Sequence, residues 1–397
     1  MPINMHQLPP LDTIPPFAEL EYVEPYTESA LEHWRTVGDP LADTVVRELA
    51  AAGPLTNIFD LLGAVRARAA SGDENCAAFL RHTNDAPPWA DFDAMVPGQR
   101  LIATYGPFMG VSLLSGSLVG GAVFQKMALV TAMTGMLSGS ATQRLSETMA
   151  MVLRMAFPDE IRPGGKAHET LARVRLLHAG IRRHLLDTGR FSHPREVPIN
   201  QQDLAITLAL FGYLNIRSLS KLGIALRRTE IDGFLLLWRY AGYVLGIAPD
   251  LLPHSIEEQQ AFFLSSCKHQ AKPDKLSVQT KGVLDDVAKT LTRRTRPAYP
   301  TVRTFLHQVT RHLSGNDYVT GMQIDDLGDY WALEAFRGLG RGFSFTRHFV
   351  PGGEAALHKL GAREFSRVLR RQAKHKAPGY RVQENPRTLY AGKQPGG

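Results

Sequence analysis

Cysteine is scarce in this sequence of 397 residues, which contains only Cys76 and Cys267. The two lie far apart, and neither belongs to a Cys-x-x-Cys motif. This pattern excludes a disulfide framework and a zinc finger, and it is typical of a protein from a reducing compartment. A chain of this length can bury a sizeable core without such crosslinks.

The start of the chain lacks the pattern of a secretory signal. Residues 1–16 are rich in proline and contain no basic segment followed by an apolar one, so we expect a cytoplasmic protein. The formal net charge is +7, and basic residues are densest at 268–303 and 363–376. These basic stretches lack a pattern of interleaved aromatic residues and contain no nucleic-acid-binding motif. We therefore expect solvated helix faces and a basic tail, and no nucleic-acid partner.

Charge is almost absent from residues 106–139, where Lys126 is the only charged residue. A membrane span is one interpretation, because about 20 apolar residues suffice to cross a bilayer. The residues of this run are, however, mostly small rather than strongly hydrophobic, with five glycines and three serines between positions 106 and 121. We therefore expect close-packed buried helices, which would also let a flat ligand approach the backbone, and no membrane span.

Apolar residues recur at helical spacing along most of the chain, whereas period-two alternation is almost absent, which predicts an all-α fold. The expected helices span 28–53, 57–81, 141–157, 167–188, 201–214, 231–247, 276–294, 300–314 and 354–374. The nearly apolar range 231–247 should be central, and the last three should be outer helices. We expect an extended proline-rich arm at 1–27, one helical domain at 28–350, and a basic helix with a flexible tail at 351–397.

The range 167–188 contains a candidate site. Its apolar residues recur at spacings of three and four, and His178 is the polar member of that stripe: Leu171, Val174, His178, Ile181 and Leu185. The histidine is either a core residue bonded to a carbonyl or a ligand, since neutral imidazole commonly binds haem iron. Arg175 and Arg182 lie one turn to either side of His178. They either pair with haem propionates or belong to the solvent-exposed face of the helix. We expect His168 and His184 near the surface.

The preceding range, 141–157, places Arg144 and Thr148 one turn apart. This pair would fix a propionate or orient bound oxygen, or it belongs to an ordinary surface face. Methionine is concentrated nearby, with seven residues between positions 109 and 155. Flexible thioethers line adaptable apolar pockets, and they also fill cores.

The stretch from Arg144 to Gly189 resembles the latex-clearing-protein (rubber oxygenase) family, which also includes oxygenases that cleave isoprenoid side chains in fungal biosynthesis. The resemblance is carried by the Arg-x-x-x-Thr pair at 144–148 and by Val174-Arg175-Leu176-Leu177-His178-Ala179. The ranges 38–43, 198–204 and 238–246 are similar to the family as well. The similarity covers about residues 30–250.

The resemblance implies a globin-like helical core with additional peripheral helices that holds haem b non-covalently, and the lack of a Cys-x-x-Cys-His motif fits this. It implies that His178 is the proximal iron ligand and that Arg144 and Thr148 maintain the haem environment. The implied activity is dioxygen-dependent oxidation or cleavage of a carbon–carbon double bond in a hydrophobic, isoprenoid-like substrate. A haem peroxidase or peroxygenase, and a non-catalytic carrier of haem or lipophiles, are the alternatives.

The sequence departs from the family in its acidic and basic residues near the site. Rubber enzymes often have a lysine that reaches the iron just before the threonine, where this chain has Glu147. They also carry a glutamate on the preceding helix, whereas residues 108–146 contain no acid here. Glu147 would then act as a distal acid–base group, with a pKa raised by burial, or pair with a nearby arginine.

Overall fold

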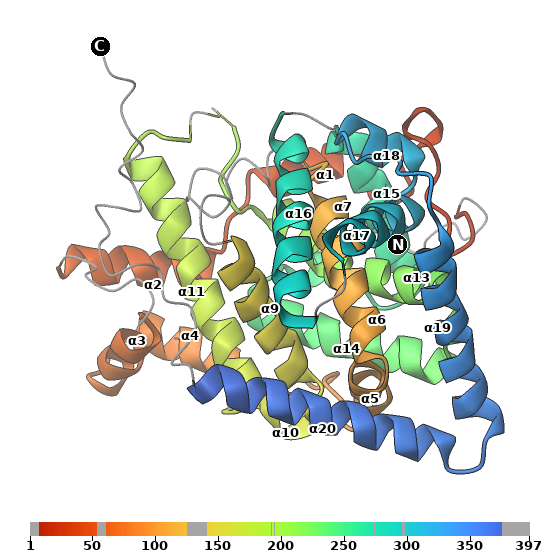
Figure 1. Ribbon diagram of the computed structural model, residues 1–397. Coiled ribbons are helices and arrows are strands. Elements are labelled where there is room, and N and C mark those ends of the chain that lie inside the picture. Colours follow the sequence, from red (N-terminus) through yellow and green to blue (C-terminus); the bar gives the residue numbers. More distant parts are fainter. Residues whose placement is uncertain are drawn as a thin grey trace.

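The computed structural model describes residues 8–53, 61–124, 141–191, 193, 195–272, 275–295 and 298–374, with backbone alone at 141–147, 275–280, 293–295 and 371–374. In this part of the chain the only β-type pairing is one antiparallel bridge between Phe124 and Ala271. The predicted all-α fold is therefore confirmed (Figure 1).

The helices of the first half precede or surround the candidate site. They are η2 (Phe17–Glu19), α1 (Glu28–Arg35), α2 (Pro40–Ala51), α3 (Leu61–Ala70), α4 (Glu74–Asn84), α5 (Val96–Thr104), α6 (Gly106–Val111), the π-helical η3 (Ser112–Leu118), α7 (Val119–Gly121), α9 (Ala141–Met155), α10 (Pro158–Ile161) and α11 (Lys166–Asp187). The predicted helices 141–157 and 167–188 correspond to α9 and α11.

The second half adds the centre and one side of the molecule. Its helices are α12 (Gln201–Phe211), α13 (Tyr213–Lys221), α14 (Arg228–Val244), η4 (Pro249–Leu251), α15 (Ile256–Gln270), α16 (Lys275–Thr295), α17 (Tyr299–Ser314), α18 (Asn316–Gly321), α19 (Trp331–Phe349) and α20 (Gly353–Lys374). Helices α15 and α19 were not predicted. Helix α17 buries five consecutive residues, 306–310, so this part is enclosed on all sides and its prediction as an outer helix was wrong.

Three ranges predicted as single helices are pairs of helices. The break in 28–53 follows from Asp39, whose carboxylate accepts a hydrogen bond from the Ala42 amide and starts α2 at Pro40. The break in 57–81 follows from Gly72, which has a φ of +96°, and from the Asp73 cap of α4. In 201–214, Gly212 separates α12 from α13 at a point where a Cβ would lie 2.2 Å from Gln259 Oε1.

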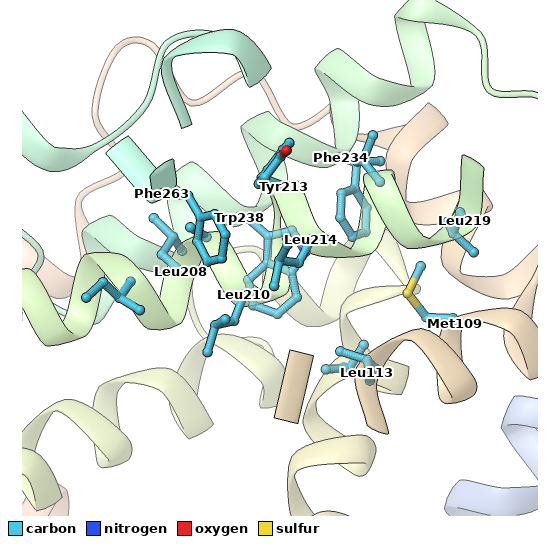
Figure 2. Close-up of a cluster of buried hydrophobic side chains, with 14 of the residues drawn as sticks. Met109, Leu113, Leu208, Leu210, Tyr213, Leu214, Leu219, Phe234, Trp238 and Phe263 are labelled. Carbon is cyan, nitrogen blue, oxygen red and sulfur yellow. The ribbon is translucent and has the colours of Figure 1, made fainter. Parts of the chain in front are cut away.

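Helix α14 lies at the centre of the hydrophobic core, as predicted from its apolar sequence. Its side chains Phe234 and Trp238 are almost fully buried and pack among side chains from α6, α12, α13 and α15 (Figure 2). Helix α5 crosses α14 at Gly98, where a Cβ would lie 2.1 Å from the backbone nitrogen of Phe234. The core therefore depends on direct backbone contact between these two helices.

The described part of the apolar run, residues 106–124, packs inside the protein as predicted. Ser112 donates a hydrogen bond to Asn215, Ser117 donates one to the Leu210 carbonyl, and Gly116 lies close to Ser218. Residues 125–139 of the run lie outside the described residues. Among the described helices, none is alone long and apolar enough to cross a membrane, although Val96–Thr104 and Gly106–Gly121, bent by 88°, meet those criteria as a pair.

Candidate functional site

Helix α11 carries the candidate ligand. It begins after Gly165, where a Cβ would lie 2.4 Å from the Asp159 carbonyl oxygen, and it ends before Gly189, which has a φ of +61°. The apolar members of the predicted stripe are all buried: Leu171, Val174, Ile181 and Leu185. His178 is the half-buried member of this stripe. The sequence pattern therefore predicted the buried face of α11 correctly.

The imidazole of His178 has no hydrogen-bond partner among the described residues, and its Nδ1 is buried. Burial and, to a smaller extent, the nearby Arg182 lower its pKa to about 4, while Asp39 acts in the opposite direction. The ring is therefore neutral at physiological pH and has a nitrogen lone pair available. No group of three or more His, Cys, Asp or Glu side chains in the described part of the chain could hold a metal ion.

Helix α9 packs beside α11 and brings its predicted residues to that side of the site (Figure 1). Thr148 is half-buried, while the side chains of Arg144 and Glu147 lie outside the described ones. Helix α6 approaches the same helix, since a Cβ at Gly110 would lie 4.0 Å from Met149 Cε. Met155 is fully buried. Of the seven methionines in this region, Met127, Met133 and Met136 are outside the described residues.

Arg175 forms a buried ion pair with Asp39. Its Nε lies 2.6 Å from Asp39 Oδ2, and its Nη2 lies 2.9 Å from Asp39 Oδ1. A third nitrogen, Nη1, lies 3.0 Å from Nδ1 of His82, a ring that stacks on Tyr243. Desolvation and the adjacent guanidinium lower the pKa of His82 to about 4, so this histidine is neutral and can accept the hydrogen bond.

Arg182 is also bound to the protein. It pairs with Asp43 and donates hydrogen bonds to the backbone carbonyls of Pro198 and Ile199, at 3.1 and 2.7 Å. Desolvation raises the pKa of the Asp43 carboxyl, and Arg182 offsets part of this rise. Both arginines beside His178 therefore have aspartates as partners, which favours a structural role over the contact with haem propionates that the sequence suggested.

Asp39 and Asp43 were missed as site residues, although they lie in the range 38–43 that carries part of the resemblance. A signal was available, because two acids four residues apart share a helix face and so do two arginines seven apart on α11. Gly246 completes the arrangement with a φ of +81°, and a Cβ there would lie 2.3 Å from Asp39 Oδ2. Only glycine fits at this position.

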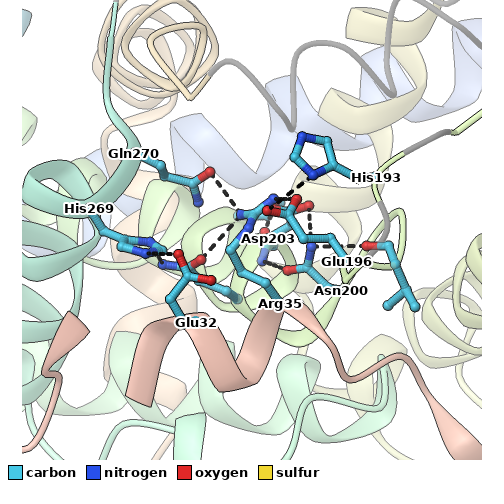
Figure 3. Close-up of polar contacts among 11 residues, drawn as sticks. Glu32, Arg35, His193, Glu196, Asn200, Asp203, His269 and Gln270 are labelled. Atoms are coloured by element: carbon cyan, nitrogen blue, oxygen red, sulfur yellow. Dashed lines mark hydrogen bonds and ion pairs between the residues drawn. The ribbon is translucent and has the colours of Figure 1, made fainter. Parts of the chain in front are cut away.

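A second buried network surrounds Arg35 at the end of α1 (Figure 3). Its guanidinium lies 2.6 Å from Glu196 Oε2, 2.9 Å from Gln270 Oε1 and 3.4 Å from Asp203 Oδ1. Asn200 caps α12 by accepting a hydrogen bond from the Asp203 amide, which agrees with the predicted helix start at residue 201. This network fixes the segment before α12 against α1 and α15.

Gln201 connects the ranges that carry the resemblance. Its Nε2 donates to the carbonyls of Gly38 and Gly246, at 2.7 and 3.0 Å, and its Oε1 accepts from the Ala248 amide. Together with the Arg182 bonds to Pro198 and Ile199, these contacts gather the ranges 38–43, 198–204 and 238–246 around α11. Segments far apart in the sequence therefore support the helix that bears His178.

The two other histidines of α11 differ in their surroundings. His168 is buried, with 1% of its surface exposed, and its Nε2 lies 2.8 Å from the Thr83 carbonyl oxygen. Its prediction as a surface residue was wrong, because α4 covers that side of α11. His184 is half-buried near the end of the helix.

The comparisons agree with this arrangement of helices. A sequence model described as "ER-bound oxygenase mpaB/B'/Rubber oxygenase, catalytic domain" matches residues 105–345, more than half of the chain. The solved structure of latex clearing protein LCP in the closed state is similar in fold, with a TM-score of 0.58 and 18% identity over 84% of this chain and 90% of that chain. No curated protein matches. The chain therefore belongs to the family of mpaB-type ER-bound oxygenases and rubber oxygenases.

Proposed function

We propose that this protein is a haem b-dependent oxygenase that uses dioxygen to oxidise or cleave a carbon–carbon double bond in a hydrophobic, isoprenoid-like substrate. One observation supports the cofactor: His178 is a neutral imidazole whose buried Nδ1 has no hydrogen-bond partner among the described residues, on the apolar stripe of α11. A buried polar atom without a partner is costly, so such a residue calls for an explanation.

Coordination of iron by His178 would explain this environment. A haem ligand must be a neutral imidazole with a free lone pair, and the pKa of about 4 keeps the ring in that form. The side chain also retains accessible surface although its pKa reflects strong desolvation. A neutral ring that is half-buried, with part of its surface accessible, is what an iron ligand on this helix would require.

The remaining side chains would position the substrate and control water. Bound haem would supply the iron at which dioxygen is activated. Helix α9 packs beside α11 and comes close to Gly110 of α6. Apolar surfaces in this region would bind an aliphatic chain by burying apolar area and excluding water. Thr148, half-buried on α9, has a hydroxyl that can donate a hydrogen bond. We propose Glu147, one position before Thr148, as a distal acid–base group. Arg144, one turn before Thr148, would fix a haem propionate or orient dioxygen.

The family supports the proposed substrate class. Its description names rubber oxygenases, enzymes that act on a polyisoprene, and the similar solved structure is that of a latex clearing protein. The apolar residues around His178 are compatible with an aliphatic alkene and offer no described cationic side chain free to bind a charged substrate, since Arg175 and Arg182 are both paired.

The absorption spectrum of the His178→Ala variant tests the proposal. Wild-type protein reconstituted with hemin should show a Soret band that shifts when carbon monoxide is added after reduction. The variant should lose haem or its native spectrum, and free imidazole should restore part of it because it can enter the space left by the side chain. His184→Ala, on the same helix, is the matched control and should keep the wild-type spectrum.

Two further readouts distinguish the outcomes. Unchanged haem content and spectrum in His178→Ala would reject the ligand assignment. Turnover of squalene or a synthetic oligoisoprene should consume dioxygen and yield products with carbonyl ends. Turnover with hydrogen peroxide but not with dioxygen would favour a peroxygenase, and stoichiometric haem without turnover of any alkene would favour a carrier.

A further inference from the structure

The hairpin between α19 and α20 exposes a cluster of large apolar side chains. Phe345, Phe349 and Val350 are 60%, 73% and 44% exposed, and we call these three residues the aromatic tip. The two phenyl rings contact each other, with centroids 5.2 Å apart. Figure 1 shows α19 and α20 meeting in a loop at one corner of the molecule, away from the central helices. The tip therefore projects from the body.

The hairpin is held firmly on its inner side, so the tip is not a loosely attached segment. Arg347, between the two phenylalanines, is buried and pairs with Glu230 of α14, and its Nη1 lies 3.3 Å from the Tyr105 hydroxyl. Phe343 packs against Phe108, with ring centroids 5.6 Å apart. These buried contacts direct the neighbouring residues Phe345 and Phe349 outward. A single exposed apolar residue needs no explanation, but a rigid cluster marks an interaction surface.

A row of basic residues follows the tip along the chain. Lys359, Arg363, Arg367 and Arg370 recur at spacings of four and three, lie on one face of α20 and are exposed. The inner face of the same helix carries the buried Phe365. Residues 353–374 contain six Lys and Arg against two Glu, so this helix provides much of the net charge of +7. Arg367 pairs with Glu364, which leaves the row strongly positive.

We propose that the aromatic tip and the basic row form a docking surface for a lipid bilayer that contains anionic lipids. Aromatic side chains at a protruding corner can enter the headgroup boundary, and a polybasic helix is attracted by the negative surface potential of such a bilayer. A second copy of the chain is disfavoured as occupant because two basic rows would repel each other. As proposed, the contact is peripheral and is made by the aromatic tip and the basic row alone.

The docking surface goes beyond the proposed function and does not require haem. It has a consequence for that function, because a lipophilic alkene partitions into bilayers and a docked enzyme would meet it there. Vesicle binding by purified protein can be measured without substrate or turnover. Failure of the oxygenase proposal and failure of the docking proposal are therefore distinguishable.

Vesicle flotation tests the proposal. Full-length protein should bind vesicles of phosphatidylcholine with about 30% phosphatidylserine and bind pure phosphatidylcholine vesicles much less, with binding that weakens as salt is added. The double variant Phe345→Ser/Phe349→Ser should bind the mixed vesicles at least about 10-fold more weakly, because the apolar area that enters the boundary is lost. Arg363→Glu/Arg370→Glu should remove most of the preference for phosphatidylserine.

Trp331→Ser is the matched control. Trp331 is an exposed aromatic (61%) at the other end of α19, about 27 Å from the tip for a helix of this length. This variant should bind the mixed vesicles like wild type. Equal loss in Trp331→Ser and in the tip variant would overturn the proposal, as would absence of vesicle binding by wild type. A dimer in sedimentation that only the tip variant abolishes, without vesicle binding, would instead identify an interface between copies.

Discussion

His178 is distinguished from the other residues of its helix face by the cost of charging it. The ring is strongly desolvated, Val174 and Ile181 one turn to either side are buried, and a positive charge on the ring would lie near Arg182. Both effects favour the neutral ring, which is also the form that binds a metal. Protonation of His178 is therefore expected to lower the stability of the folded state and also to prevent metal binding.

The pH dependence of stability follows from this environment. The pKa of His178 is about 4 in the folded protein against 6.5 for an ordinary histidine. Between these values the unfolded chain binds a proton that the folded chain does not, so the free energy of unfolding should fall as pH is lowered from 6.5 towards 4. The contribution is on the order of 3 kcal/mol across that window. Urea unfolding of haem-free protein at several pH values measures it.

The variant His178→Leu isolates this contribution, because leucine has similar size and does not titrate. Its free energy of unfolding should depend less steeply on pH between 6.5 and 4, by up to one proton. An identical slope in wild type and His178→Leu would show that the ring titrates normally in the folded protein.

At the scale of residues, the sequence predicts positions on a helix face but not long-range partners. The period of α11 was sufficient to place His178 among apolar side chains. It could not show that Arg175 pairs with an aspartate 136 positions away, because such a contact depends on how α2 packs against α11. The prediction that His168 lies near the surface was wrong for the same reason, since the Thr83 carbonyl that it contacts belongs to another helix.

Helices α2 and α11 are joined by two buried or partly buried ion pairs, Arg175–Asp39 and Arg182–Asp43. The arginines lie three residues before His178 and four after it, so the pairs fix the rotation and position of the helix around that ring. A buried guanidinium that loses its carboxylate is strongly unfavourable, whereas removing both charges costs much less. These two ion pairs, which we call the α2–α11 clamp, therefore position α11. Their contribution to the free energy of unfolding can be measured.

Asp39→Asn should lower the free energy of unfolding by about 3–5 kcal/mol. Asparagine can still cap α2, so the loss isolates the missing charge opposite Arg175. The double variant Asp39→Asn/Arg175→Met should recover most of the stability, because no unpaired charge then remains buried. Urea unfolding of the single and double variants provides the cycle.

The exposed pair Arg183–Asp187 on the same helix serves as the control. Its side chains are 34% and 60% exposed, and Asp187→Asn should change stability by less than about 1 kcal/mol. A loss for Asp39→Asn as small as that for Asp187→Asn would contradict the clamp. So would a double variant that is less stable than the single one.

At the scale of elements, most of the long helices were predicted, whereas α15, α19 and most of the short helices were not. The bounds of α9, α11 and α17 agree with the predicted ranges to within two residues, and those of α14 are shifted by three, because each has a continuous apolar face. The breaks at Gly38–Asp39 and Gly72–Asp73 were missed although both contain an aspartate cap, since apolar periodicity continued across them. Helix α15 was missed because it buries polar residues such as Gln259 and Ser265.

In the molecule as a whole, the last described helix lies across elements from the first half of the chain. Helix α20 packs against α5, α9 and α19, and Figure 1 shows it running along one side of the protein. Its closest approach is at Gly361, where a Cβ would lie 1.8 Å from the Ala103 carbonyl oxygen of α5. Since α5 in turn crosses α14 at Gly98, α20 is connected to the centre of the core through backbone contacts.

Gly361→Ala should therefore displace α20 from α5 and lower the free energy of unfolding by roughly 1–3 kcal/mol, the usual cost of an overpacked contact. Hydrogen exchange should become faster in α20 while α14 keeps its protection, because the displaced helix is peripheral to the core. Gly342→Ala on α19 is the matched control. A Cβ there meets nothing within 4 Å, so this variant should be neutral or more stable by up to about 1 kcal/mol. Equal stability and equal exchange of α20 in the two variants would mean that α20 does not depend on its contact with α5.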